Sequence, residues 1–298
     1  LRRAVTHPYR APVPVICVGN LIAGGSGKTP VALSLAAILD RQGIDTAIVM
    51  RGYGGRLAGP LRANPDAHDA AAVGDEALLA AAQTAAWVAR DRAAGVRAAV
   101  ADGAQTIILD DGFQNPAVAK DLSLVVVDAA YGFGNGRLLP AGPLRERIAA
   151  GLARADAVVL LGDGELTALG HPVLRASLQP IDGNRFKAAP IVAFAGIGRP
   201  EKFFAGLREL GTRLVAEHCF PDHHRYRPEE LATLRNEARQ SNARLVTTRK
   251  DWVRLPVEER QDIEVLDVEL RWHDHTALDA LLAPLHIRIA NAGRAAAG

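Results

Sequence analysis

The stretch VICVGNLIAGGSGKTP, residues 15–30, decides the fold. Residues 13–18 are apolar and rich in β-branched side chains, which predicts a strand that is buried on both faces. The glycines that follow allow a tight turn, and its N–H groups form an anion pocket with the amino end of the helix predicted next. A strand, a Gly-x-Gly-Lys-Thr turn and a helix in this order are typical of a P-loop, which binds the phosphates of a nucleotide.

The loop departs from the strict P-loop pattern at one position, because Ile22 stands where the pattern has a glycine. A glycine-rich turn without a ligand is the alternative, but the order of strand, turn and helix favours phosphate binding. Lys28 is then expected to reach the β- and γ-phosphates, and the hydroxyl of Thr29 to bind Mg²⁺. The predicted nucleotide-binding residues are Ala23, Gly24, Gly25, Ser26, Gly27, Lys28 and Thr29.

The composition is that of a soluble globular protein with an ample core. The chain has 298 residues, of which 49% are hydrophobic and 23% charged, and its net charge is +2. This balance, without basic residues interleaved with aromatic ones, gives no indication of nucleic-acid binding. The two cysteines form neither a disulfide framework nor a metal-ligand pattern. No apolar run approaches the roughly 20 residues of a membrane span.

Strands and helices alternate along the chain in two series, which predicts an α/β fold. The expected first domain, residues 1–175, is a P-loop NTPase-type domain with a mostly parallel sheet, and the expected second, residues 176–298, is a smaller α/β domain. Residues 173–178 are expected to form an extended connector, and residues 263–270 a single last strand.

Acidic residues accompany the loop at two places. Asp110 and Asp111 follow an apolar strand, and such a pair opposite a P-loop suits Mg²⁺, which prefers oxygen ligands. Asp75 opens an apolar helix, where it is either an N-cap or a base presented at a helix end; spacing alone favours the cap.

Three polar loops add candidates. Residues 51–56 follow the second predicted strand, where substrates of α/β sheets bind, although a hinge loop has the same composition. His223 and His224 are adjacent and have no third ligand at metal-binding spacing, so a catalytic or orienting histidine is favoured over zinc, with a surface loop as the alternative. Residues 249–251 either contact phosphate or adenine or form a solvated strand end.

These motifs together resemble those of the tetraacyldisaccharide 4′-kinases, the lipid A 4′-kinase family of Gram-negative bacteria. The family's loop also lacks the first glycine, which accounts for Ile22. The chain departs from the family at Asn115, where His is usual, and at Arg147, where Pro is usual. The matching stretches cover nearly the whole chain in order: residues 19–30, 51–54, 74–76, 110–114, 134–146, 220–223 and 248–251.

The resemblance implies transfer of a phosphoryl group from ATP, with Mg²⁺, to the 4′-hydroxyl of a tetraacyldisaccharide 1-phosphate, giving lipid IVA. It places the enzyme at the cytoplasmic face of the inner membrane, with the lipid and the membrane surface as partners and no obligate protein partner. Residues 1–10, basic with scattered apolar side chains, are then the end of a membrane-surface helix or an ordinary solvated leader. The alternatives are another P-loop enzyme, a ligase or metallochaperone GTPase, and a nucleotide-gated membrane scaffold without catalysis.

The resemblance also implies a role for each site residue. Asp75 is the implied base for the 4′-hydroxyl, paired with His223 of the second domain, which is therefore expected to close over the active site. The implied catalytic residues are Asp75, His223, Lys28, Asp110 and Asp111. The implied metal ligands, directly or through water, are Thr29, Asp111, Glu146 and Gln114. The candidate substrate contacts are Asn20, Arg51, Tyr53 and Arg145.

Overall fold

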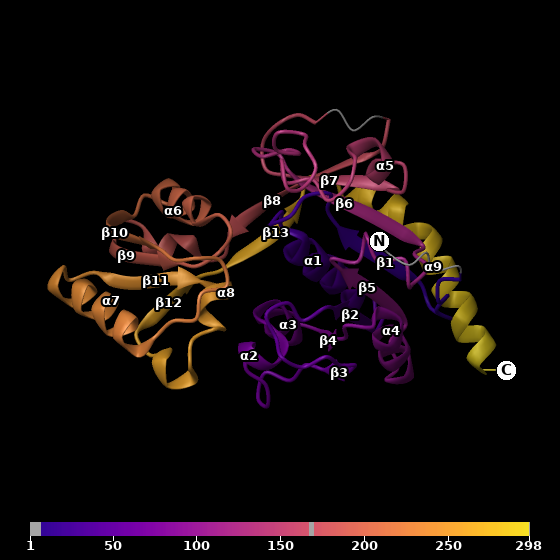
Figure 1. Cartoon of the computed structure of the whole chain (residues 1–298), viewed down its shortest axis with the longest axis horizontal. Helices are drawn as coiled ribbons and strands as arrows, with labels where there is room; N and C mark the ends of the chain where they lie inside the picture. Colours follow the sequence, from indigo (N-terminus) through magenta and orange to yellow (C-terminus); the bar gives the residue numbers. More distant parts are fainter. Residues whose placement is uncertain (1–6, 167–169, 298) are drawn as a thin grey trace.

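Two β-sheets organise the residues that the computed structural model describes, 7–166 and 170–297 (Figure 1). The nine-stranded sheet has the spatial order β13 (Val268–Trp272), β8 (Val173–Pro180), β7 (Ala157–Leu161), β6 (Leu122–Asp128), β1 (Val15–Gly19), β5 (Thr106–Asp110), β2 (Thr46–Met50), β4 (Ala85–Val88) and β3 (Leu61–Arg62). The four-stranded sheet has the order β10 (Arg213–Cys219), β9 (Pro190–Ala195), β11 (Arg244–Thr248) and β12 (Ile263–Leu266).

The P-loop strand β1 lies in the middle of the larger sheet, between β5 and β6, and runs parallel to both. The edge strands β3 and β13 are antiparallel to their neighbours, while the other pairs of this sheet are parallel. Both faces of β1 are buried, with Ile16 and Val18 in one core cluster and Val15 and Cys17 in another. The mostly parallel α/β sheet expected from the alternation of elements is thus confirmed.

Helices cover both faces of each sheet. The helices are α1 (Lys28–Arg41), α2 (Ala70–Val73), α3 (Asp75–Ala81), α4 (Arg92–Ala101), α5 (Ile148–Leu152), α6 (Pro200–Glu209), α7 (Pro228–Gln240), α8 (Arg249–Trp252) and α9 (His275–Ala297), with 3₁₀ turns at Gly183–Phe186 and Val257–Glu259. On the larger sheet, α1, α3 and α9 share one core cluster, and α4 and α5 share the other. On the smaller sheet, α6 and α7 pack on opposite faces. No described helix is long and apolar enough to cross a bilayer.

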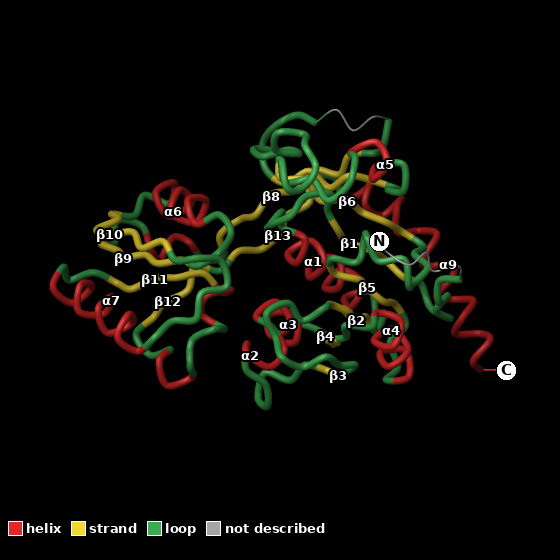
Figure 2. The backbone as a smooth tube through the Cα atoms, in the orientation of Figure 1, coloured by secondary structure: helices red, strands yellow, loops and turns green. Residues whose placement is uncertain are grey.

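Two strands carry the chain between the sheets, and here two expectations were wrong. Residues 173–178 are no mere connector, because they belong to β8, which pairs with β7 in the larger sheet. The single strand expected at 263–270 is interrupted at Asp267: β12 lies in the smaller sheet, whereas β13 pairs with β8 in the larger one. Figures 1 and 2 show β8 and β13 as the two neighbouring strands that pass between the sheets.

We call the larger sheet with α1–α5 and α9 the larger body, and the smaller sheet with α6–α8 the smaller body. The chain leaves the larger body after β8 and returns to it with β13 and α9. The domain division at residues 175 and 176 stays a prediction, since β8 extends over both sides of it.

Candidate active site

The P-loop is built as its sequence requires. Gly27 precedes α1 with a φ of 83°, a left-handed conformation that glycine adopts without strain. Gly24 and Gly25 are exposed, so the loop backbone lies open at the amino end of α1. Asn20, expected as a substrate contact, is fully buried instead, and its amide nitrogen donates to the hydroxyl of Ser26 at 2.9 Å. It braces the loop from inside, and its contact with a substrate stays a prediction.

The residue that replaces the Walker glycine has a structural partner. Ile22 forms an isolated β-bridge with Leu144, and the flanking N–H of Ala23 donates to the carbonyl of Pro143 at 2.7 Å. On the other side of the bridge, the N–H of Arg145 donates to the carbonyl of Leu21 at 2.8 Å. The P-loop is therefore extended at this point, which needs no glycine, and the pairing brings the long loop before α5 to the phosphate site.

Two aspartates line the base of the loop. Thr29 donates its hydroxyl to Oδ2 of Asp110 at 2.8 Å, while Asp111 lies 3.7 Å from Nζ of Lys28 and 3.0 Å from Nη1 of Arg145. Burial, and then the charge of Glu76, raise the pKa of Asp110 to about 7. The buried Oδ1 of Asp110 has no hydrogen-bond partner among the described residues. An unpaired oxygen in a carboxylate cluster is suited to a hard cation.

Gln114 and Glu146 complete this end of the site. The amide nitrogen of Gln114 donates to the carbonyl of Asn20 at 2.6 Å and to Glu146 at 3.1 Å, and Arg145 donates to its oxygen at 3.3 Å. Glu146 also pairs with Arg154 at 2.9 Å. Within the described ranges, no group of three or more His, Cys, Asp or Glu could hold a metal alone. A cation here would need further oxygens, as Mg²⁺ does when it binds phosphate and water beside one or two carboxylates.

Asp75 forms the second part of the site. It is the first residue of α3, and the N-cap is Gly74, so the cap favoured by spacing is wrong. Its side chain is buried, and Oδ2 lies 2.9 Å from Nδ1 of His223. The ring of Tyr53 lies 5.1 Å from the ring of His223. Among the described contacts Arg51 joins none of these side chains; its charge acts on the buried Arg92.

The two adjacent histidines have different partners. His223 has a φ of 59° and faces Asp75 across the two bodies. His224 is held within the smaller body, where its Nε2 lies 2.9 Å from Glu230 and its ring stacks on Phe220 at 4.8 Å. Only His223 is therefore placed to act on Asp75.

A group of cations from the smaller body surrounds the start of α3. Arg254 lies 3.2 Å from Oδ2 of Asp75, and Lys250 lies 3.2 Å from Glu76. Burial raises the pKa of Asp75, but the hydrogen bond from His223 and the charges of Lys250 and Arg254 outweigh it and hold that pKa below its usual value. The sequence interpretation missed this, because residues 249–251 were weighed only as a nucleotide contact or a solvated strand end. Lys250 and Glu76 are 174 positions apart, and Arg254 lies outside the predicted segment, so no local pattern could have paired these residues.

A second contact joins the smaller body to the P-loop itself. Arg199 donates to the carbonyl of Gly25 at 2.8 Å and pairs with Asp128, at the end of β6, at 2.9 Å. Lys202 pairs with the same carboxylate. Burial raises the pKa of Asp128, but Lys202 and Arg199 outweigh it and lower the pKa. These residues also escaped the sequence analysis, since none belongs to a local motif.

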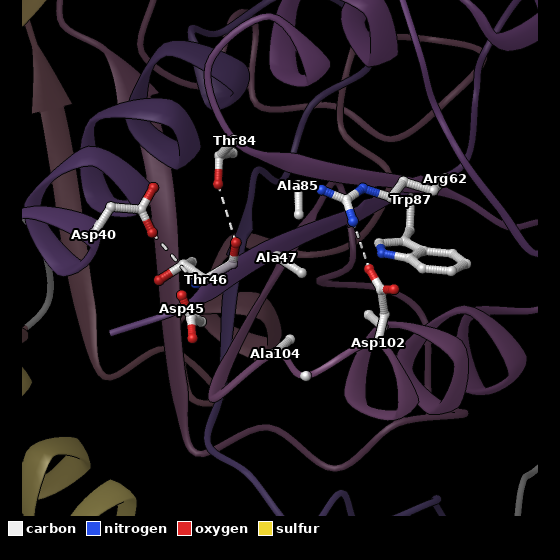
Figure 3. A pocket seen from close by; sticks show the side chains of 12 residues that line it. Asp40, Asp45, Thr46, Ala47, Arg62, Thr84, Ala85, Trp87, Asp102 and Ala104 are labelled. Atoms are coloured by element: carbon white, nitrogen blue, oxygen red, sulfur yellow. Dashed lines mark hydrogen bonds and ion pairs between the residues drawn. The ribbon is translucent and has the colours of Figure 1, made fainter. Parts of the chain in front are cut away.

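A hollow of about 410 Å³ lies away from this site, at the amino ends of β2 and β4 (Figure 3). Several of its polar groups are paired: Arg62 with Asp102 at 2.7 Å, and Asp40 and Thr84 with the backbone of Thr46. Because the strands are parallel, the P-loop and Asp110 lie at the opposite edge of the sheet. The hollow is not part of the candidate site.

The comparisons with known proteins agree with this geometry. The family model described as tetraacyldisaccharide-1-P 4′-kinase matches residues 1–286. The tetraacyldisaccharide 4′-kinase of Rhodospirillum centenum is 54% identical over 95% of this chain and 86% of its own length, and that of Gluconacetobacter diazotrophicus is 53% identical over 94% and 88%. The crystal structure of LpxK from Aquifex aeolicus in complex with ATP has a TM-score of 0.76 at 28% identity, covering 93% of this chain and 90% of that one. The chain therefore belongs to the tetraacyldisaccharide-1-P 4′-kinase family, as its motifs predicted.

Proposed function

We propose that this chain transfers the γ-phosphoryl group of ATP to the 4′-hydroxyl of a tetraacyldisaccharide 1-phosphate, with Asp75 as the general base. The observation that carries the proposal is the position of the Asp75–His223 pair, 2.9 Å apart, next to the phosphate site. The two parts adjoin, because helix α3, which begins at Asp75, contacts helix α1, which follows the P-loop. A base, its orienting histidine and a phosphate cradle are the parts that a kinase acting on an alcohol needs.

Asp75 accepts the proton of the 4′-hydroxyl as the new P–O bond forms. Its lowered pKa keeps it ionised at neutral pH, and in a loose transition state the proton moves late, so a weak base suffices. His223 supports it by donating from Nδ1 to the carboxylate, which fixes the direction of the oxygen that receives the proton.

The P-loop end holds the donor. The backbone of residues 23–27 and the amino end of α1 bind phosphate oxygens, and Lys28 and Arg145, both beside Asp111, offset negative charge on the γ-phosphoryl group. Mg²⁺, when bound, supplies further charge neutralisation. Thr29, Asp110 and Asp111 would hold it, with Gln114 and Glu146 acting through water.

The acceptor is a lipid, and one loop offers an apolar surface for it. Tyr131, Leu138 and Leu139 are 46%, 43% and 55% exposed in the loop that also carries Arg145. We assign acyl-chain or membrane contact to this loop, and sugar or phosphate contact to Tyr53, Arg51 and Arg145. Because the proposed acceptor is a membrane lipid, we place the enzyme at a membrane surface, and the family resemblance implies the cytoplasmic face of the inner membrane. Residues 1–10, expected to be either the end of a membrane-surface helix or a solvated leader, lie largely outside the described residues, which begin at 7.

One assay tests the proposal. The purified protein is incubated with ATP labelled at the γ-phosphate, Mg²⁺ and tetraacyldisaccharide 1-phosphate, and label on the lipid is measured. Labelled lipid supports the proposal. Release of ADP or GDP without labelled lipid would favour another P-loop enzyme, and binding of ATP and lipid without turnover would favour a scaffold.

A further inference from the structure

We infer that Arg254 is a positioning residue for the phosphoryl transfer, because it holds the carboxylate of Asp75 together with His223. The inference rests on the proposed role of Asp75 as base, and names a side chain of the smaller body that orients this base together with His223 and adds to the charges that keep it ionised.

Arg254 and His223 meet at the same oxygen of Asp75. Nε of Arg254 lies 3.2 Å from Oδ2, and Nδ1 of His223 lies 2.9 Å from it. The side chains of Arg254 and Asp75 are 4% and 3% exposed, so water does little to weaken their attraction. The other oxygen, Oδ1, accepts only the N–H of Glu76 among the described groups, at 2.9 Å. A carboxylate oxygen has a further lone pair, so Oδ1 is the atom left to receive the substrate proton.

The guanidinium of Arg254 is itself fixed on three sides. Its Nη2 lies 3.1 Å from Asp251, Nη1 donates to the carbonyl of Gly196 at 2.9 Å, and Nε donates to the carbonyl of Lys250 at 3.0 Å. The carbonyl of Gly196 also accepts the backbone N–H of His223 at 3.1 Å. Arg254 and His223, the two partners of Asp75, are therefore both held by the carbonyl oxygen of Gly196.

Asp251, the ion-pair partner of Arg254, is itself held in place. Asp251 is fully buried and accepts from the N–H of Gly196 at 2.8 Å, from the hydroxyl of Tyr226 at 2.6 Å and from the hydroxyl of Thr248 at 2.6 Å. A planar guanidinium held beside a fixed carboxylate and by backbone carbonyls keeps its positive charge in one place, so Nε stays beside Oδ2 of Asp75 as an ion-pair contact. The contacts with Asp251, Gly196 and Asp75 start from three different nitrogens of the guanidinium, whereas lysine carries its donors on one nitrogen and does not reproduce this arrangement.

The charged groups around Asp75 determine in which direction its pKa changes when Arg254 is replaced. They come from α3 itself, from the loop after β10, and from α8 with the turn after it: Glu76, Asp222, His223, Lys250 and Arg254. Lys250 is engaged by two of the acids, Glu76 at 3.2 Å and Asp222 at 3.8 Å. Arg254 is the permanent cation in direct contact with Asp75. Its removal disfavours the ionised form and raises the pH at which the base gains a proton.

The test compares Arg254→Gln and Arg254→Lys with the wild type in the labelled-lipid assay, with kcat followed against pH at saturating substrates. Arg254→Gln should lower kcat by up to about 10²-fold, as expected for a misplaced base, and move the acid limb of kcat to higher pH, with KM for ATP unchanged. Arg254→Lys should keep the acid limb closer to that of the wild type and still lower kcat. The matched control is Arg235→Gln, which removes an ion pair with Glu259 in the smaller body. It should change neither kcat nor the pH of the acid limb.

If the role of Arg254 were purely structural, Arg254→Gln would lower Tm but leave the acid limb of the kcat–pH profile at the pH of the wild type. A folded Arg254→Gln variant with wild-type kcat and pH limb would overturn the inference. Should that variant fail to fold, Arg254→Lys carries the test, and wild-type kcat in it would overturn the inference.

Asp75→Asn, assayed in parallel, separates the proposed role of Asp75 as base from the inferred role of Arg254 in positioning it. Near-normal turnover in Asp75→Asn removes the proposed base and this inference with it, whereas an inactive Asp75→Asn beside an unaffected Arg254→Gln contradicts the inference alone.

Discussion

Nδ1 of His223 lies 2.9 Å from the carboxylate of Asp75, although 148 positions separate the two residues in the chain. Asp75 begins α3 in the larger body, and His223 lies in the loop after β10 in the smaller one. The pair exists only while the two bodies are in contact. If Asp75 is the base, as proposed above, its pairing with His223 requires contact between the bodies, and such a requirement would protect ATP from transfer to water.

Replacing His223 should impair catalysis more than replacing its neighbour. His223→Ala leaves Asp75 without its hydrogen bond, so we expect kcat to fall on the order of 10²-fold with KM for ATP unchanged. His224→Ala is the matched control, because it loses a contact with Glu230 inside the smaller body and should lower Tm while keeping most of kcat. Steady-state kinetics and thermal melts of both variants check this. Equal kcat losses in the two would contradict the assignment of His223.

Thr29→Val should weaken the use of Mg²⁺. The variant keeps the shape of the side chain but loses the hydroxyl that donates to Asp110 at 2.8 Å. We expect the Mg²⁺ concentration for half-maximal activity to rise about tenfold, while circular dichroism stays unchanged. Thr233→Val is the control, since this exposed threonine of α7 donates only to the backbone of its own helix in the described structure. An unchanged Mg²⁺ requirement in Thr29→Val would remove Thr29 from the metal site.

The double variant Leu138→Ser and Leu139→Ser should raise KM for the lipid substrate and leave KM for ATP unchanged. Each exposed leucine that contacts an acyl chain or a membrane contributes roughly 1.5 kcal/mol or less, so the pair should raise KM by up to about 10²-fold. Val257→Ser is the control, because this apolar side chain is 73% exposed in the smaller body. Assays in mixed micelles of stated lipid content measure both constants. A change in KM for ATP alone would place the loop with the nucleotide.

Acidification should separate the two bodies before the chain unfolds. Burial raises the pKa values of Asp75 and Asp128, but His223 on the first and Lys202 on the second outweigh it, and both values are lowered. A carboxyl with a lowered pKa stabilises its contact above its ordinary value of 3.8, and that contribution is lost as the pH falls through the lowered value. We therefore expect the radius of gyration from small-angle X-ray scattering to grow below pH 3.8 while the helix signal persists. Asp128→Asn should shift this opening toward neutral pH. An opening that occurs only together with loss of helix signal would contradict the prediction.

Local sequence signals predicted the parts of the fold and site that depend on neighbouring residues. The P-loop follows from apolar β-branched residues, glycines and Lys28, all within one stretch. Asp110 and Asp111 follow from an acidic pair after a buried strand. Asp75 was singled out from the residues, but spacing made it an N-cap, and only the family resemblance made it a base.

The remaining parts depend on contacts between distant segments. β8 and β13 are distant in the chain: Val268 pairs with Pro180, 88 positions earlier. The local sequence of residues 173–178 therefore did not indicate that they form a strand of the sheet. Arg254 meets Asp75, and Arg199 meets Gly25, only through the packing of the smaller body on the larger. Arginine and lysine near a strand end are equally typical of a solvated surface, so composition could not separate the two cases.

The central claim is tested most directly by single-turnover transfer of labelled phosphate from ATP to tetraacyldisaccharide 1-phosphate by Asp75→Asn. Asparagine keeps the size of the side chain but cannot accept the proton of the 4′-hydroxyl as a carboxylate does. We expect the transfer rate to fall by about 10²–10⁴-fold while the Kd for ATP stays unchanged. A transfer rate close to that of the wild type, with ATP still bound, would contradict it.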